Sequence, residues 1–267
     1  MIRSLYSGAS GLRSHQTRMD VIGNNIANVN TAGYKASRAN FQDILYQVVR
    51  YGSAGSDEAG GVNTSQVGLG VAVSSITNNT RQGGLQATGR DLDLAVNGNG
   101  WFIVSPDGGE TKYYTREGTF YIDNSGYLVN SSGYFVLDEG GSTINFGTSG
   151  LANIYISRNG KISYTPLGGD FEPDAFTIGL AMFPNQDGLE RAGSNLFKVS
   201  LTSGEPVEGA PAAEGFGEVI SGYLEMSNVD LTDEFTALIT TQRGYQANAR
   251  TVTVSDSMLE ELLNLKR

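Results

Sequence analysis

The last forty residues of the chain repeat their apolar side chains as a long amphipathic helix does. From Asn228 to Arg267, one set of positions recurs at alternating steps of four and three, and eight of its ten members are apolar or aromatic. An α-helix turns once in about 3.6 residues, so this spacing draws one narrow stripe along it. The set is Leu231, Phe235, Leu238, Gln242, Tyr245, Ala249, Val252, Asp256, Leu259 and Leu263. Asp230 is the expected N-cap, with Thr232 as the alternative.

The first thirty residues carry the same signature. Their stripe consists of Ile2, Leu5, Ala9, Leu12, Gln16, Met19, Gly23 and Ile26. Two such helices can pair, but two narrow stripes are too shallow to exclude water completely. If several apolar side chains stay half exposed to water, up to about 10 kcal/mol of burial free energy is lost. Packing against further copies of the chain would recover it. A two-helix stalk within one molecule is the alternative.

Composition describes the region between the helices and excludes several functions. Only 17% of the 267 residues are charged and 36 are glycine, which is typical of a turn-rich β protein. The net charge of −10, without a basic run, argues against nucleic-acid binding. The chain has no cysteine and only one histidine, His15, which excludes disulfides, thiolate sites and most histidine-based metal or triad chemistry.

The sequence also lacks the usual signals of membrane insertion and cleavable export. No apolar run approaches the roughly 20 residues that span a bilayer. Arg13, His15, Arg18 and Asp20 interrupt the first helix where a signal peptide would have its apolar core. We therefore expect either a cytoplasmic protein or export by a route that reads no cleavable signal.

The chain changes character after the first helix. The Asn- and Gly-rich segment Gly23–Lys35 is expected to end that helix. A second helix is predicted at Ser37–Tyr51 from the spacing of Phe41, Ile44, Leu45 and Val48, and an extended arm or loop over Gly52–Gly70. A short strand should follow at Val71, Val73 and Ile76, and then a polar connector over Arg81–Gly89.

From Asp91 to about Ser200 the pattern is that of an antiparallel sandwich or barrel, with Asn-Gly and Asp-Gly turns between short strands. The predicted strands are Leu92–Val96, Trp101–Val104, Tyr113–Thr115, Thr119–Ile122, Tyr127–Val129, Tyr134–Leu137, Ile154–Ser157, Lys161–Tyr164 and Phe176–Phe183. Ser203–Gly217 is expected to be a loop and Val219–Met226 a last strand.

The predicted fold class is α+β. N- and C-terminal helices should pair as a coiled-coil-like inner domain, with an all-β domain inserted between them. We expect a terminal helical polymerisation domain at 1–35 plus 228–267, a connecting region at 36–90 plus 201–227, and the β domain at 91–200.

Candidate chemistry is weak. Asp91 and Asp93 share a strand face and resemble paired carboxylates, but solvated edge residues are the simpler interpretation. His15 is expected off the helix seam as a surface or packing residue, and Trp101 in the core. We therefore predict no catalytic, cofactor-binding or metal-binding residue.

Several runs together resemble the bacterial flagellar rod and hook proteins. The run Asn24–Lys35, Asn-Asn-Ile-Ala-Asn-Val-Asn-Thr-Ala-Gly-Tyr-Lys, closely resembles the signature of that family. The other runs that resemble it are Met1–Gly8, Thr88–Val96, Tyr114–Gly118, Glu225–Leu231, Gln242–Gln246 and Asn264–Lys266. They cover both ends and the middle of the chain in order.

This resemblance implies a structural protein without enzymatic activity or cofactor, located in the flagellum. It implies export through the flagellar type III apparatus without a cleaved signal, and assembly into a hollow helical tube lined by the terminal helices. The implied partners are many further copies, other axial proteins (rod, hook cap and hook–filament junction) and the export apparatus, but neither nucleic acid nor an inserted membrane.

The resemblance covers both hook and distal rod proteins. The Thr88–Val96 run and the Asn264–Arg267 ending look more like hook, whereas the length looks like distal rod or a short hook protein. We therefore predict a hook subunit acting as a flexible universal joint, with a rigid distal rod subunit as the alternative.

Two sets of residues are predicted to matter for assembly. Subunit contacts are expected at Leu5, Leu12, Met19, Ile26, Leu231, Phe235, Leu238, Tyr245, Val252, Leu259 and Leu263. The family motif is carried by Asn24, Asn25, Asn28, Thr31, Gly33, Tyr34 and Lys35. A glycan-binding β module on a stalk and a hydrolase with Asp91 and Asp93 are rival hypotheses, but neither explains matched helices at the two ends.

Overall fold

The computed structural model describes residues 2–55, 60–147, 151–167 and 170–265. The chain divides into two units. The helical unit comprises Met1–Ala27, Ser37–Asn78 and Asp230–Arg267. The β unit comprises Asn28–Ala36 and Asn79–Val229. Lys266 and Arg267, part of the predicted family ending, lie outside the described residues.

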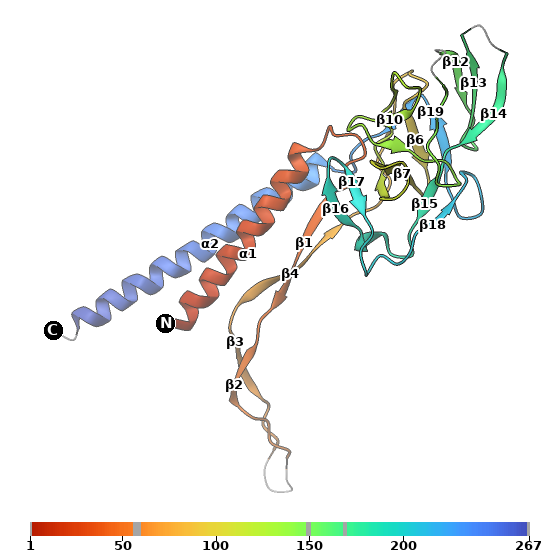
Figure 1. Cartoon of the computed structure of the whole chain (residues 1–267). Helices are drawn as coiled ribbons and strands as arrows, with labels where there is room; N and C mark the ends of the chain where they lie inside the picture. Colours follow the sequence, from red (N-terminus) through yellow and green to blue (C-terminus); the bar gives the residue numbers. More distant parts are fainter. Residues whose placement is uncertain (1, 56–59, 148–150, 168–169, 266–267) are drawn as a thin grey trace. The chain divides into compact units, whose positions relative to one another are not determined.

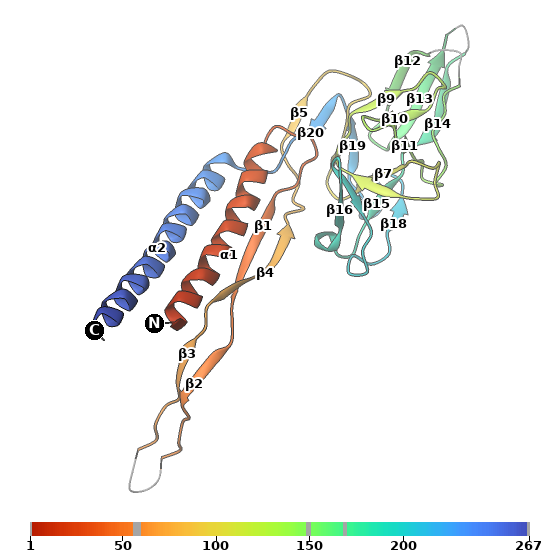
Figure 2. The same cartoon turned by 60° about the vertical axis from the view of Figure 1, so that its left-hand side comes forward.

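The helical unit consists of two long helices and a long β-hairpin (Figure 1). Its elements are α1 (Ile2–Ala27), α2 (Leu231–Asn264), β1 (Ser37–Asp43), β2 (Tyr46–Arg50), β3 (Ser65–Gly68) and β4 (Val71–Asn78). The helices pack side by side and antiparallel, and strands β1 and β4 also contact α1 (Figures 1 and 2). The predicted pairing of the terminal helices is thus confirmed.

Helix α2 begins where the sequence predicted. The Asp230 side chain accepts hydrogen bonds from the backbone N–H groups of Thr232, at 2.8 Å, and Asp233, at 3.4 Å. Asp230 is therefore the N-cap. Asp233 and Glu234 lie in the first turn, where negative charge suits the helix dipole.

The helix predicted at Ser37–Tyr51 is wrong. This segment forms β1 and β2, which pair antiparallel with β4 and β3. Four apolar positions within eight residues fit a helix or a strand equally well, and β-branched and aromatic side chains favour the strand once a partner supplies the hydrogen bonds. The predicted arm is the outer part of this hairpin.

The described part of the β unit contains sixteen short strands. They are β5 (Leu85–Ala87), β6 (Leu94–Asn97), β7 (Trp101–Ser105), β8 (Tyr113–Thr115), β9 (Phe120–Ile122), β10 (Leu128–Asn130), β11 (Phe135–Val136), β12 (Leu151–Ile156), β13 (Lys161–Pro166), β14 (Glu172–Thr177), β15 (Leu180–Met182), β16 (Glu190–Gly193), β17 (Leu196–Lys198), β18 (Val207–Gly209), β19 (Glu218–Ser221) and β20 (Tyr223–Glu225). Every pairing among them is antiparallel, so the α+β class with an antiparallel β domain is confirmed.

Strand β7 is the centre of the β unit. It belongs to a nine-stranded sheet that runs β16-β17-β8-β7-β11-β10-β9, with β15 and β18 joined beside β7. Phe102 and Val104 point into one buried cluster, and Trp101 and Ile103 into another, so both faces of β7 are covered. Trp101 is a core residue, as predicted. The remaining sheets are β12-β13-β14, β19-β6 and β20-β5.

Two predicted connectors contain strands. The segment Arg81–Gly89 includes β5, which pairs with β20, and the predicted loop Ser203–Gly217 includes β18, which pairs with β15. The predicted strand Phe176–Phe183 is two strands, the end of β14 and β15. Short strands rich in Gly and polar residues gain their hydrogen bonds from distant partners, which local sequence does not show.

Candidate functional site

The contact between α1 and α2 is made of small and polar side chains. The hydroxyl oxygens of Ser4 and Ser255 lie 3.1 Å apart. Gly8 lies against Val252, Gly11 against Asn248 and Gly244 against His15, so the contacts advance along α1 as they go back along α2, by steps of three or four residues. We call this line of contacts the seam.

The glycines allow the two backbones to approach closely. A Cβ at Gly11 would lie 2.8 Å from the Asn248 amide nitrogen, and one at Gly244 would lie 2.7 Å from a ring carbon of His15. Real Cβ atoms essentially never come so close. His15, expected off the apolar stripe as a surface or packing residue, packs between α2 and the Phe41 ring, 5.7 Å away.

Except for Val252, which lies against Gly8, the predicted contact residues lie beside the seam rather than in it. In α1, Leu5, Leu12, Met19 and Ile26 are all partly exposed, as are Leu238, Val252 and Leu259 in α2. Four others in α2 are exposed: Leu231, Phe235, Tyr245 and Leu263. Seven of the eleven predicted contact residues are therefore partly covered within the described chain, and four keep exposed apolar surface.

Apart from Val252, the seam residues were missed by sequence reasoning. Thr241, Gly244, Asn248 and Ser255 recur at steps of three, four and seven on α2, and Thr241 and Ser255 are buried. The signal was present as a periodic row of small residues. A search weighted toward large apolar side chains does not detect it.

Asn25, from the predicted family motif, ties the helical unit together. Its amide nitrogen donates to the Ser37 carbonyl at 2.8 Å and to Glu234 Oε1 at 2.9 Å, and its amide oxygen accepts from the Ser37 N–H at 3.0 Å. It is 1% exposed. One side chain of α1 therefore bonds to both β1 and α2.

Two titratable groups of this unit have shifted pKa values. Burial, and then the positive charge of Arg18, lowers the pKa of His15. Burial raises the pKa of Glu234, with a further rise from Asp233, while the hydrogen bond from Asn25 and the charge of Arg18 act in the opposite sense.

The end of the same motif belongs to the β unit, where Gly33, Tyr34 and Lys35 are buried. Gly33 has a φ of +70°, and a Cβ there would lie 2.5 Å from the backbone nitrogen of Glu117, so only glycine fits. Thr31 donates its hydroxyl to the Asn28 side chain at 3.1 Å. Asn24, in the helical unit, is exposed.

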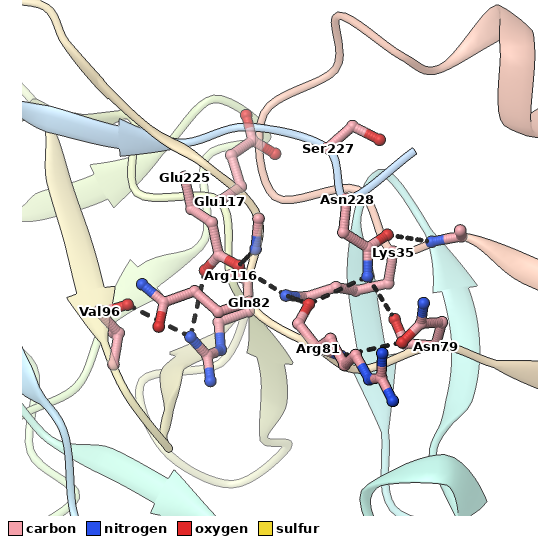
Figure 3. Close-up of polar contacts among 12 residues, drawn as sticks. Lys35, Asn79, Arg81, Gln82, Val96, Arg116, Glu117, Glu225, Ser227 and Asn228 are labelled. Atoms are coloured by element: carbon pink, nitrogen blue, oxygen red, sulfur yellow. Dashed lines mark hydrogen bonds and ion pairs between the residues drawn. The ribbon is translucent and has the colours of Figure 1, made fainter. Parts of the chain in front are cut away.

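Lys35 enters a buried ion cluster (Figure 3). Its Nζ lies 2.6 Å from Glu225 Oε1 and donates to the Arg81 carbonyl at 2.9 Å. Glu225 also receives Arg116 Nη1 at 3.1 Å and the Gly83 N–H at 2.8 Å. Burial lowers the pKa values of Lys35 and Arg116, and the charge of Glu225 opposes the shift of each.

Asn228 extends the cluster to a neighbouring segment. Its amide nitrogen donates to the carbonyls of Asn79, at 2.7 Å, and Arg81, at 3.0 Å, while its oxygen accepts from the Ala36 N–H at 2.8 Å (Figure 3). The segments 34–36, 79–83 and 225–228 are therefore joined. Glu225, Asn228 and Arg116 each stand in a run that resembled the family, but sequence reasoning assigned them no role.

The site offers no catalytic arrangement. Asp93 is buried and its carboxylate lies 3.1 Å from Arg90 Nη1, whereas Asp91 is exposed, so they are not a matched pair of free acids. Within the described residues there is no group of three metal-ligating side chains. Neither described helix is long and apolar enough to cross a membrane.

Comparison with known proteins shows the family to which the chain belongs. Three family models match it: "Flagella basal body rod protein" at residues 5–35, "Flagellar hook protein FlgE/F/G D1 domain" at 95–164 and "Flagellar basal body rod FlgEFG protein C-terminal" at 220–265. The flagellar basal-body rod protein FlgG of Bacillus subtilis is 48% identical over 268 residues, covering 100% of both chains. The chain belongs to the flagellar rod and hook protein family.

Other members show both branches of this family. FlgG of Caulobacter vibrioides is 40% identical over 270 residues, covering 99% of this chain and 100% of that protein. The flagellar hook protein FlgE of Borreliella burgdorferi is 29% identical over 443 aligned positions, with both chains covered completely. Rod and hook proteins of the family are structural components of the flagellum, not enzymes, and the chain is an axial flagellar protein located there.

The preference for a hook subunit is less well supported than its alternative. The relatives that match over the full length at 40–48% identity are rod proteins, whereas the hook relative is 29% identical. Both classes align with the whole chain.

Proposed function

We propose that the chain is a distal rod subunit of the flagellar basal body. It assembles with further copies of itself, and with other axial proteins above and below, into a rigid hollow shaft, after export without a cleaved signal. The observation that carries the proposal is the 48% identity to a rod protein FlgG with no unmatched region in either chain.

The helical unit supports assembly through its uncovered apolar surface. Phe235 is 49% exposed and Leu263 is 69% exposed, on a helix whose seam is already filled by small residues. Exposed apolar rows of this length are disfavoured in water unless another surface covers them. Helical units of neighbouring copies would cover them and form the inner wall of the tube.

A deletion strain tests the assignment. Electron microscopy of its basal bodies should show rods that stop short and carry no hook, and expression of this chain should restore them. Complete rods without hooks would show that the chain is a hook subunit and that the proposal is wrong.

Single substitutions on α2 test the role of the helices. Leu238→Asp or Leu259→Asp should prevent polymerisation of the purified protein, because either places a charge on a half-buried apolar position. Thr240→Asp, on the exposed side of the same helix, is the matched control. Unfolding of the β unit should be unchanged in all three, and normal polymers from both leucine variants would contradict the proposal.

A further inference from the structure

The last turns of α2 extend beyond α1. The Ser4–Ser255 contact sets the register, on which Ile2 at the start of α1 faces Ser257. From Leu259 onward, no described residue of α1 lies opposite α2. Leu262 is 50% exposed and Leu265 82% exposed, so this end presents apolar side chains in several directions. We call Leu259–Leu265 the acidic end, because it contains Glu260 and Glu261.

Two carboxylates stand among these leucines. Glu260 and Glu261 are exposed, and neither forms an ion pair with another described residue. The segment therefore combines apolar anchors with negative charge that no other described residue pairs. A surface that covers it should be apolar at its centre and positively charged around it.

The exposed side of α1 has that character. Arg3, Tyr6 and Arg13 are exposed and recur at steps of three and seven, which places them on one side of the helix. Tyr6 is 71% exposed, and neither arginine has a carboxylate partner among the described residues. Tyrosine and arginine are the residue types enriched at interface centres. We call this set the basic face.

Within one chain the two surfaces cannot meet. The seam register places Tyr6 level with Thr253, nine residues from Leu262, which is about 13 Å along a helix at about 1.5 Å per residue. A second copy lying alongside and shifted by about that distance would bring them together. The start of α1 and the end of α2 lie at the same end of the helix pair (Figures 1 and 2), and the shift is small compared with the 34-residue helix α2.

We infer that the acidic end of α2 in one copy docks on the basic face of α1 in the next copy, a contact that rests on the proposed assembly. The two surfaces differ, so the contact is heterologous. Each copy has one acidic end and one basic face, and further copies can therefore be added without limit. A symmetric dimer formed through the acidic end alone would place Glu260 and Glu261 against like charges. The contact therefore gives the polymer a direction.

Reciprocal charge reversal tests the pairing. Glu260→Lys with Glu261→Lys, or Arg3→Glu with Arg13→Glu, should each lower polymer yield at least tenfold, measured by sedimentation and electron microscopy of the purified protein. All four changes together should restore most of the yield. A control variant of the same net charge combines Glu260→Lys and Glu261→Lys with Arg243→Glu and Arg250→Glu in place of the two changes on α1. This control should not restore the polymer yield.

The outcomes separate this inference from the proposed function. If the wild-type protein polymerises but neither reversal lowers the yield, or the fourfold variant is no better than the twofold ones, the pairing is wrong while the rod assignment stands. Restoration by the control would show that net charge, rather than this contact, is responsible, and would overturn the inference.

Disulfide crosslinking gives a second measurement that does not rely on charge reversal. The chain has no cysteine, so Tyr6→Cys with Leu262→Cys introduces the only two thiols. A disulfide needs Cα atoms within about 7 Å, so this pair cannot close within one chain. Oxidised polymers should give a ladder of multimers on a denaturing gel, whereas Tyr6→Cys with Thr240→Cys should give monomers. Monomers from both pairs would overturn the inference.

Discussion

Lys35 Nζ and Glu225 Oε1 lie 2.6 Å apart in the β unit, and neither side chain is more than 1% exposed. Arg116, 2% exposed, shares the same carboxylate. Two buried cations thus depend on one buried anion. Their attraction to Glu225 offsets a large desolvation cost, so removal of the anion leaves that cost uncompensated.

Glu225→Gln should therefore lower the free energy of unfolding of the β unit by about 3–5 kcal/mol. Chemical denaturation followed by Trp101 fluorescence measures it. Asp174→Asn is a matched control, because Asp174 pairs with Lys161 at 2.9 Å on the surface, and should change stability by less than about 1 kcal/mol. Equal losses in the two variants would show that burial of the Glu225 cluster has no special role.

Gly11→Ala should separate the helices of the seam. The new methyl group would lie 2.8 Å from the Asn248 side chain, and such overpacking costs about 1–3 kcal/mol. Gly23→Ala on the same helix has no atom within 4 Å of the new methyl group and should stabilise the helix by about 0.5–1 kcal/mol. Thermal unfolding followed by helical circular dichroism compares them, and a gain in both would contradict close packing at Gly11.

Asn25→Ala should loosen the helical unit at the base of the hairpin. It removes hydrogen bonds to Ser37 and Glu234 and leaves buried polar groups unpaired, which costs about 1–3 kcal/mol. Hydrogen exchange of the β1 amides should become faster. Asn24→Ala, at the exposed neighbouring position, should have a smaller effect on the same amides.

Acidification should destabilise the helical unit through His15. Its pKa in the folded chain lies below 6.5, so the unfolded chain takes up the proton first as the pH falls. The contribution of His15 to the free energy of unfolding is therefore fully present above pH 6.5 and is lost as the pH falls through the pKa of the folded chain. The free energy of unfolding changes by at most about 1.4 kcal/mol per pH unit.

His15→Gln should remove this dependence, and thermal unfolding at several pH values measures the difference. Arg18 is the charged group that acts on His15, and Arg18→Gln should raise the pKa of His15. Because the chain has one histidine, its NMR titration reports that pKa directly. Glu234 has a raised pKa, so its protonation stabilises the folded chain as the pH falls through the range above 4.5, opposite to the effect of His15. If the pH dependence of unfolding in His15→Gln equals that of the wild type, another group is responsible for it.

The sequence predicted the elements whose periodicity is long and regular. Helix α2 was recognisable from the 4-3 spacing of its apolar residues and from the Asp230 cap, because both are local properties. The seam was not, because its contacts are made by Gly11, Gly244 and Asn248, which a search for large apolar residues does not weight. The strands at Ser37–Arg50 were mistaken for a helix, because their partner strands follow many residues later.

The buried ion cluster shows a different limit. Lys35, Arg116 and Glu225 lie in runs that resembled the family, yet they are separated by 81 and 109 residues. Burial of a charged side chain is costly without a partner, and residue type alone does not show which partner is present. Only the fold reveals that each supplies the partner for another.

The Asn228 hydrogen bonds and the Lys35–Glu225 pair have a mechanical consequence. They join three separate segments of the β unit, 34–36, 79–83 and 225–228, at one place. A force applied to any of these segments is transmitted to the other two as well as to the sheets of the β unit. When either 34–36 or 79–83 loosens under torsion, 225–228 still holds the other through Glu225 or Asn228.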